Sequence, residues 1–369
     1  MSAAGQRRAA RRTKRRDVTR AVYVGGVPIG GGHPIPVQSM TNTKTADVEA
    51  TARQIQELED VGCDIVRVAV PDMESARAIE AIKKRVRAPI VADIHFDYRL
   101  ALESMARGAD KIRINPGNIG GAEQVRQVAA MAKARGVPIR VGVNGGSLER
   151  SLAEKYGGAT PEALAESALA QAEALEGLGF SDIVLSIKSS DAFTAVEACR
   201  IVSKLRTGYP QHIGMTEAGT PLVGVARNAV GISALLREGI GDTVRVSLTG
   251  DPVDEVVAAI DILRTHGLRR GGVRLVSCPA CGRCGISVVG LAEEVERRVR
   301  SIRSDKEITV AVMGCAVNGP GEARGADVGV AGGRGRALLF RRGEAVRMVP
   351  EAEVVDALVA EVERIAGQT

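Results

Sequence analysis

The chain has 369 residues, which is enough for two domains or for one large barrel with an appended domain. Apolar residues make up 45% of the chain and charged residues 25%, and no apolar run approaches the roughly 18 residues of a membrane span. The net charge is +6, but the first 20 residues alone carry eight basic residues and one acidic residue. The remainder is therefore close to neutral. We expect a soluble protein that binds no membrane and whose folded part binds no nucleic acid.

Residues 1–20, "MSAAGQRRAARRTKRRDVTR", form a basic arm. The arm lacks the apolar stretch of a secretory signal or a membrane anchor. We expect it to be solvated and disordered, and an Arg-rich transit peptide is the alternative. Because no secretory signal is present, the six cysteines predict metal or redox chemistry in a reducing compartment, and we expect a cytoplasmic location.

Residues 21–270 repeat one unit, in which a short β-rich run is followed by a turn and a helical stretch. Eight runs are expected to be strands: 36–40, 64–70, 89–95, 111–117, 138–144, 182–188, 212–218 and 242–249. Eight such units over about 250 residues predict a (β/α)8 TIM-type barrel, which we expect to bind the substrate. The alternative is an open doubly wound sheet, which more usually has fewer strands and a Gly-rich phosphate loop after the first; no such loop is seen here.

Polar residues recur with period two within these strands, so they lie on one face of each strand. A barrel interior is normally apolar, whereas this one would hold four arginines and a lysine. Asp93 and Glu217 are too few to balance these cations, so we expect a bound ligand with more than one phosphate group. Some of the arginines, Arg245 above all, could instead lie outside the barrel and pair with helix carboxylates. The candidate substrate-binding residues are Arg67, Arg113, Asn115, Arg140, Asn144, Lys188 and Ser247.

Residues 271–369 have a different pattern, which predicts a separate, smaller α+β domain. Three thiols lie within "SCPACGRCG", and Cys315 follows Cys284 after 31 residues. This run resembles the ligand spacing of a ferredoxin-type iron–sulfur cluster. A structural zinc site is the alternative, but it usually pairs a CxxC with a second CxxC or with two histidines, and the second half here has one Cys and no His.

At this point the resemblance becomes specific. "SCPACGR" followed by "MGCAVNGPGEA" resembles the two cluster-binding motifs of the 4-hydroxy-3-methylbut-2-enyl diphosphate synthases of the non-mevalonate isoprenoid pathway. "QSMTNT", "IRINPGN", "VGVNGGSL", "SIKSSD", "TEAGT" and "SLTGDP" resemble the barrel of the same family, so the likeness leaves only the basic arm uncovered. It implies a 4Fe–4S cluster held by Cys278, Cys281, Cys315 and Glu322. Cys284 is then an extra thiol near the site, and an all-Cys cluster is the alternative.

The resemblance also implies the reaction. This is the reductive ring opening and dehydroxylation of 2-C-methyl-D-erythritol 2,4-cyclodiphosphate to 4-hydroxy-3-methylbut-2-enyl diphosphate, by two one-electron transfers through the cluster. A carboxylate is a harder and more labile iron ligand than a thiolate, so Glu322 could yield its iron to a substrate oxygen. Glu217, assisted by Asp93, is the candidate acid for the departing oxygen. Glu217 could instead be the counter-ion of Lys188 or Arg245.

By the same resemblance we expect reduced flavodoxin or ferredoxin as the electron donor. We also expect a homodimer in which the cluster domain of one chain closes over the barrel mouth of the other. One alternative is a non-catalytic iron–sulfur electron-transfer or corrinoid-type barrel protein, which would not need so many inward cations. A second alternative is a pterin-type barrel enzyme with a structural zinc domain, which would be colourless.

Overall fold

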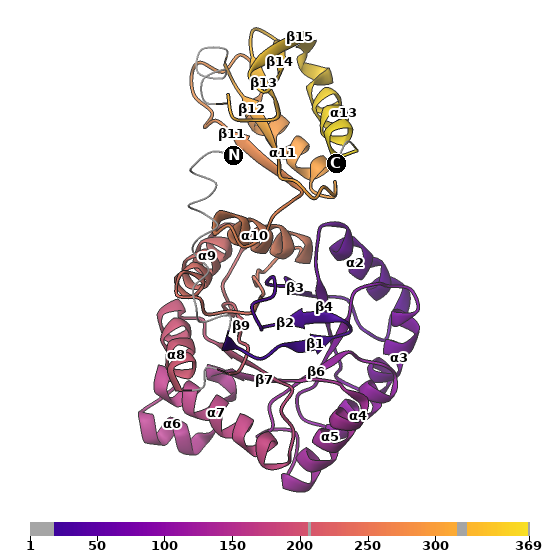
Figure 1. Cartoon of the computed structure of the whole chain (residues 1–369), viewed down its shortest axis with the longest axis vertical. Coiled ribbons are helices and arrows are strands. Elements are labelled where there is room, and N and C mark those ends of the chain that lie inside the picture. Colours follow the sequence, from indigo (N-terminus) through magenta and orange to yellow (C-terminus); the bar gives the residue numbers. More distant parts are fainter. Residues whose placement is uncertain (1–17, 206–207, 316–322, 368–369) are drawn as a thin grey trace. The chain divides into compact units, whose positions relative to one another are not determined.

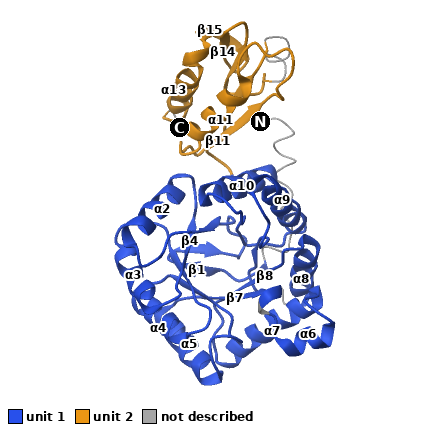
Figure 2. Cartoon of the chain, turned by 180° about the vertical axis from the view of Figure 1, so that it is seen from behind, with its two compact units in different colours: residues 1–269 blue, residues 270–369 orange. Residues whose placement is uncertain are grey.

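The computed structural model describes residues 18–205, 208–315 and 323–367. The chain divides into two compact units, Met1–Arg269 and Arg270–Thr369 (Figure 2). Each unit has a hydrophobic core of its own. The two units are therefore described separately.

The first unit contains a ring of eight parallel strands with helices outside it (Figure 1). Six strands pair in chain order: β3 (Gln38–Met40), β4 (Ile65–Ala69), β5 (Ile90–Asp93), β6 (Lys111–Ile114), β7 (Ile139–Asn144) and β8 (Ile183–Lys188). A parallel pair, β9 (His212–Ile213) and β10 (Thr243–Val244), completes the set. Parallel bridges from Leu185 to Gln211 and from Val37 to Val244 join this pair to its neighbours and close the ring. The predicted TIM-type barrel is confirmed.

The helices follow the strands in alternation, as right-handed crossover units require. They are α2 (Val48–Asp60), α3 (Met73–Lys83), α4 (Tyr98–Ala106), α5 (Ala122–Arg135), α6 (Arg150–Tyr156), α7 (Pro161–Gly177), α8 (Ala192–Leu205), α9 (Pro221–Arg237) and α10 (Pro252–Thr265). A short 3-10 turn, Gly145–Ser147, precedes α6. The two helices between β7 and β8 explain why the sixth expected strand follows the fifth after an unusually long interval.

The seventh and eighth strands are shorter than the expected 212–218 and 242–249, because regular pairing lasts for only two residues in each. Near the ends of these short strands, the buried side chain of Asn228, on α9, forms hydrogen bonds with backbone groups of both chain segments. Its Oδ1 accepts a hydrogen bond from the N–H of Met215 at 3.2 Å, and its Nδ2 donates to the carbonyl of Ser247 at 3.2 Å. A side chain from a helix thus satisfies backbone groups that strand pairing would otherwise satisfy.

An N-terminal hairpin, which was not among the predicted elements, packs against one end of the barrel. Strands β1 (Val22–Val24) and β2 (Val27–Ile29) are joined by Gly25 and Gly26, which have φ angles of 53° and 89°. Two consecutive positive φ angles suit a tight two-residue hairpin turn, and glycine adopts them without steric cost. The apolar side chains of the hairpin pack against strand residues Ile65, Val91 and Val184.

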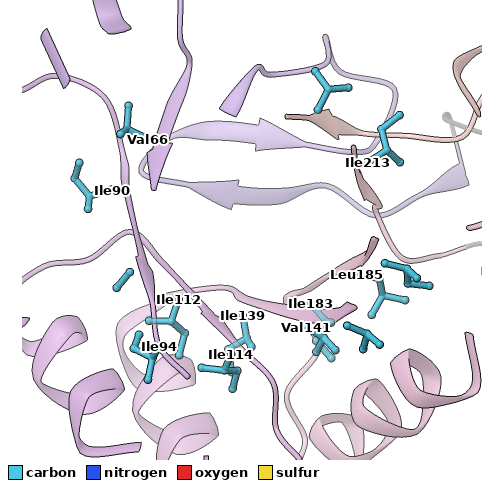
Figure 3. Packing of buried hydrophobic residues seen from close by; sticks show 14 of the residues in the cluster. Val66, Ile90, Ile94, Ile112, Ile114, Ile139, Val141, Ile183, Leu185 and Ile213 are labelled. Atoms are coloured by element: carbon cyan, nitrogen blue, oxygen red, sulfur yellow. The ribbon is translucent and has the colours of Figure 1, made fainter. Parts of the chain in front are cut away.

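Beyond the apolar residues that contact the hairpin, the two faces of the barrel strands differ in polarity. The apolar core contains the strand residues that alternate with the inward ones, among them Ile112, Ile139, Val141 and Ile183 (Figure 3). Strand side chains alternate between faces, so the residues between them, such as Arg113 and Arg140, belong to the inner face. Burial of the outer face against the helices stabilises the barrel, and the inner face is available for chemistry.

In its described residues, the second unit is a five-stranded mixed sheet with two helices, which agrees with the predicted α+β fold (Figure 1). Its elements are β11 (Val273–Ser277), α11 (Val288–Val299), β12 (Ile308–Met313), β13 (Val328–Gly332), β14 (Arg336–Arg341), β15 (Glu344–Pro350), a 3-10 turn (Glu351–Glu353) and α13 (Val354–Ala366). Strands β11, β12 and β13 are parallel, whereas β14 and β15 are added as antiparallel hairpins. Residues of α11 and α13 share one apolar cluster with the sheet.

None of the helices in the described part of the chain is long and apolar enough to cross a membrane.

Candidate functional site

A polar pocket lies in the barrel and encloses about 490 Å³ of empty space, part of which is open to solvent. The strands, or the loops that directly follow them, position most of its lining. The lining residues are Arg67, His95, Arg113, Arg140, Gly142, Val143, Asn144, Ser186, Lys188, Thr216, Arg245 and Ser247. Six of the seven residues expected to bind substrate are among them.

The strand register explains why these side chains meet. Arg113 on β6 pairs with Asp93 on β5 and with Arg140 on β7, so the three residues lie side by side on the inner face. Two positions further along β7, Gly142 provides the space for a guanidinium group. A Cβ atom at Gly142 would lie 2.4 Å from Nε of Arg113, closer than any side chain tolerates. The glycine inside this strand is therefore required by the arginine beside it.

Asp93 is the carboxylate that organises this group. Its Oδ1 lies 3.4 Å from Nη1 of Arg113, and its Oδ2 lies 3.6 Å from Nη2 of Arg67 and 3.3 Å from Nε2 of His95. Burial opposes ionisation of Asp93, but the charge of Arg67, the hydrogen bond from His95 and the charge of Arg113 outweigh it and hold the pKa well below its ordinary value. Asp93 is therefore an ionised anchor for its cationic neighbours.

A second carboxylate enters the site from a helix. Glu255 on α10 is buried and lies 3.3 Å from Nε of Arg245, and it also accepts hydrogen bonds from the Ser39 hydroxyl and the Leu248 N–H. The alternative expectation for Arg245 is thus met in part, because Arg245 pairs with a helix carboxylate but also lines the pocket.

The remaining cations are buried with little compensation. Lys188 is 9% exposed, and in the described part of the chain its ammonium group has no hydrogen bond or ion pair. Burial, together with the charges of Arg245, Arg140 and Arg67, holds the pKa of Lys188 well below its ordinary value. Arg140 is 1% exposed and donates to Oε1 of Gln38 at 3.3 Å. Uncompensated buried cations of this kind are suited to receive an anion.

Three of the expected site residues lie elsewhere or cannot be placed. Asn115 is buried, and its Oδ1 accepts a hydrogen bond from the N–H of Gly117 at 3.0 Å, so it supports the loop after β6 and is not part of the pocket lining. Glu217 is exposed, has a φ of 53°, and forms no ion pair within the described residues. It is therefore not the counter-ion of Lys188 or Arg245 in this structure. Glu322 lies outside the described residues.

Four residues near the site were not among those expected to bind or react: His95, Ser186, Thr216 and Glu255. His95 and Ser186 carried the same period-two signal as the chosen residues. Glu255 also had a signal, because it occupies a position on the apolar stripe of α10 between Val253 and Val256. Thr216 had no such signal in the sequence, because its position in the pocket lining depends on the path of the chain after β9.

The second unit contains the thiols at one edge of its sheet. Cys278 directly follows β11 and Cys315 lies two residues beyond β12, and these parallel strands pair with Ser277 opposite Val312. The N–H of Gly314 donates to Sγ of Cys278 at 3.2 Å. Within the described residues, which exclude Glu322, no group of three or more His, Cys, Asp or Glu side chains is placed to hold a metal ion.

The residues around these thiols nevertheless fit an iron–sulfur cluster. A Cβ atom at Gly314 would lie 2.4 Å from Sγ of Cys284, so only glycine can occupy this position. Backbone N–H groups that donate to sulfur, such as that of Gly314, stabilise thiolate-bound clusters. Thiols that follow two neighbouring parallel strands, with glycines near them, are of the soft donor type that such a cluster needs.

Comparison with known families agrees with both units. A model described as the GcpE TIM-barrel domain matches residues 19–260, and a model described as the GcpE protein C-terminal domain matches residues 274–364. The chain belongs to the GcpE family. The family predicted from the sequence motifs is confirmed, since curated members of the GcpE type are named as the same synthase.

Two such relatives are similar over almost their whole length. The 4-hydroxy-3-methylbut-2-en-1-yl diphosphate synthase (flavodoxin) of Geobacter sulfurreducens is 57% identical over 350 residues, which cover 95% of this chain and 98% of the relative. The protein of the same name from Caldanaerobacter subterraneus subsp. tengcongensis is 54% identical over 355 residues, which cover 96% of this chain and 99% of the relative.

Among solved structures, the dihydropteroate synthase of Xanthomonas albilineans covers 66% of this chain and 96% of its own, with 16% sequence identity and a TM-score of 0.48. A likeness at this level carries no functional argument for a member of the GcpE family, and it does not favour the pterin-type alternative.

Proposed function

We propose that this chain reduces 2-C-methyl-D-erythritol 2,4-cyclodiphosphate to 4-hydroxy-3-methylbut-2-enyl diphosphate and water, consuming two electrons and two protons. The chain is an enzyme of the oxidoreductase class, as its family membership requires. One observation supports this substrate above others: a barrel pocket is lined by four arginines and a lysine, and among the described residues two carboxylates, Asp93 and Glu255, are paired with them. A cyclic diphosphate supplies the negative charge that this pocket lacks.

The cations of the pocket bind and orient the diphosphate. Planar guanidinium groups match phosphate oxygens in pairs, and Lys188 adds a compact charge at the strand end. Asn144 and Ser247 offer hydrogen bonds from the same rim. Asn115 acts indirectly, by holding the loop that follows β6. Because Asp93 and Glu255 fix Arg113, Arg67 and Arg245 before the substrate arrives, little orientational freedom is lost on binding.

The departing oxygen needs a proton, and Glu217 is the proposed donor. Asp93 is expected to assist Glu217, and its depressed pKa favours assistance by a charged group over donation of its own proton. We propose that Asp93 positions Arg113 and the pocket residue His95, so that charge developing on the leaving oxygen meets fixed positive groups.

Cys278, Cys281, Cys315 and Glu322 are the proposed holders of a 4Fe–4S cluster. When bound, the cluster supplies electrons one at a time and one iron whose carboxylate ligand exchanges readily. The chain contributes Gly314 beside these thiols. Its lack of a side chain leaves room for Sγ of Cys284, and its N–H donates to Sγ of Cys278. An all-Cys site with Cys284 remains the competing ligand set.

We further propose that reduced flavodoxin, or a ferredoxin of similar potential, donates the electrons, as the names of the relatives indicate for those proteins. The proposal includes a cytoplasmic homodimer that binds neither nucleic acid nor membrane. Sedimentation velocity of the full chain tests the dimer. Reduction kinetics with purified flavodoxin and with purified ferredoxin identify the donor.

The deciding experiment is an anaerobic preparation of the full chain, with its iron and sulfide content and its optical and electron paramagnetic resonance spectra, recorded with and without the cyclodiphosphate. About four irons per chain and a signal changed by the substrate support the proposal. The same preparation of Glu322→Ala and Cys284→Ala tests the ligand set: loss of the cluster in the first variant alone supports the carboxylate ligand. A colourless, zinc-containing protein contradicts the proposal.

A further inference from the structure

Cys281, Gly282, Arg283 and Cys284 form a tight turn at the surface of the second unit. The N–H of Cys284 donates to the carbonyl of Cys281 at 3.1 Å, and the N–H of Cys281 approaches Sγ of Cys284 at 3.5 Å. A four-residue turn closed in this way keeps its first and last Cα atoms within about 7 Å. A disulfide spans Cα separations of about 4.4–6.8 Å, so the backbone of the turn is compatible with a disulfide between its first and last residues.

Cys278 also lies in a C-x-x-C sequence with Cys281, but its surroundings are different. Its sulfur accepts the N–H of Gly314 at 3.2 Å, and its side chain packs against apolar residues on both faces of the sheet. Cys281 is exposed and Cys284 is half-buried. The turn therefore brings Cys281 next to Cys284, and Cys278, which shares Gly314 as a neighbour with Cys284, is the competing partner.

We propose that Cys281 and Cys284 are a redox-active dithiol that closes to a disulfide by exchange with a low-molecular-weight disulfide such as oxidised glutathione. The exposed sulfur of Cys281 attacks one glutathione sulfur and releases one reduced glutathione. Cys284 then attacks the mixed disulfide on Cys281, forms the internal bond and releases the second glutathione. Two protein thiols are oxidised, one glutathione disulfide is reduced to two thiols, and no other oxidant is needed.

The pairing has a consequence for the cluster, and this part rests on the proposed function. Cys281 is one of the proposed iron ligands, and a sulfur in a disulfide cannot bind iron as a thiolate. Oxidation of the pair would withhold that ligand until a reductant reopens it. Without a thiol at position 284, the glutathione adduct on Cys281 would have no neighbour to displace it. Cys284 would thus limit lasting modification of Cys281.

The test uses the full chain, prepared anaerobically without iron or sulfide and incubated with oxidised glutathione. Remaining thiols are alkylated, and the protein is digested with trypsin. Arg283 lies between the two cysteines, so cleavage places Cys281 in peptide 275–283 and Cys284 in peptide 284–297. We expect the two peptides to be linked until dithiothreitol is added, and neither to carry glutathione.

Three variants assign the bond. Cys284→Ser should keep one glutathione on Cys281, whereas Cys278→Ser should still form the link, and Cys281→Ser should lose it. Circular dichroism melting of each variant establishes that it is folded, and Cys284→Ala repeats the first test with a different side chain. A link that survives in Cys281→Ser but not in Cys278→Ser overturns the proposal. So does a bond inside peptide 275–283, or a wild-type chain that retains glutathione on Cys281.

Iron uptake then tests the consequence. After oxidation, reconstitution without added reductant should bind about tenfold less iron than reconstitution of the reduced protein, and dithiothreitol should restore uptake. If the reduced protein also binds no cluster, the proposed function fails, while the peptide masses still decide whether the dithiol exists.

Discussion

Oδ1 of Asp93 lies 3.4 Å from Nη1 of Arg113, while the other oxygen of the same carboxylate lies 3.6 Å from Nη2 of Arg67. One buried anion therefore holds two arginines at the wall of the pocket. Burial alone would raise the pKa of Asp93, but the charges of Arg67 and Arg113 lower it well below its ordinary value. The carboxylate stays ionised wherever the enzyme is folded, which makes it a positioning group.

We expect Asp93→Asn to destabilise the protein by about 3–5 kcal/mol at pH 7, because the arginines lose their buried partner. A depressed pKa contributes stability above the unfolded value of 3.8, and that contribution is lost as the pH falls below it. The difference between wild type and variant in urea unfolding should therefore shrink between pH 7 and pH 3. Asp261→Asn, at an exposed site on α10, should show no such difference. Equal stabilities at pH 7 would contradict the anchoring role.

A second prediction concerns the role of Lys188 in substrate binding. Burial and the charges of Arg245, Arg140 and Arg67 hold the pKa of Lys188 well below its ordinary value. A bound diphosphate adds negative charge and raises that pKa, so binding should take up protons at pH values between the pKa of Lys188 in the free protein and its pKa in the complex. Calorimetry of the cyclic diphosphate in two buffers with different ionisation enthalpies measures this uptake.

The matched control for this prediction is a surface lysine. Lys188→Met should lower affinity and remove part of the proton uptake, whereas Lys84→Met, at an exposed pair with Glu80, should change neither. If wild type and Lys188→Met take up the same number of protons, Lys188 is already charged before the substrate binds.

The sequence is sufficient to predict the barrel and most of its pocket, because both depend on short-range patterns. Alternation along a strand places Arg113 and Arg140 on the inner face, whatever the rest of the fold does. The hairpin had an equally local signal in its Gly25–Gly26 turn, although it was not predicted.

Residues that act across elements could not be predicted in this way. Asn228, on α9, bonds the N–H of Met215 and the carbonyl of Ser247, and nothing in its own segment indicates which backbone groups it will meet. The same is true of Glu255, whose pairing with Arg245 requires α10 to lie beside the ends of β3 and β10. Glu217 was expected to belong to a strand, but its φ of 53° is a left-handed conformation that a strand does not contain, and β9 ends at Ile213.

Glu217 is therefore the site residue for which a direct test is most needed. We expect Glu217→Gln to lower turnover by about 100-fold, because the amide cannot supply a proton. Affinity for the cyclic diphosphate and the unfolding midpoint should not change, because Glu217 is exposed and lies outside the pocket lining. Single-turnover kinetics together with calorimetry measure both quantities.

A second variant at this position separates chemistry from backbone strain. Glu217→Gly removes the acid but also suits the left-handed conformation, so it should be as inactive as Glu217→Gln and more stable than wild type by about 1 kcal/mol. Full turnover in the Gln variant would remove Glu217 from the mechanism and leave His95 as the proton donor to test.

The last prediction concerns Lys111 and the free energy of unfolding. Its ammonium nitrogen is fully buried and has no hydrogen-bond partner in the described residues. Burial, with the charges of Arg140 and Arg67, holds its pKa well below the ordinary 10.5. Between the folded and unfolded pKa values the unfolded chain binds more protons, so stability should rise with pH through that range. Lys111→Met should flatten this rise and stabilise the protein by about 1–3 kcal/mol at pH 7.

Urea unfolding of wild type and Lys111→Met at pH 7 and pH 9.5 measures both effects, with Lys84→Met as the exposed control. A large loss of stability in Lys111→Met at pH 7 would mean that the ammonium group has a partner that the protein chain does not supply. An anion or water bound beneath the pocket would then be part of the fold, because a buried cation is retained at such a position only when something compensates its charge.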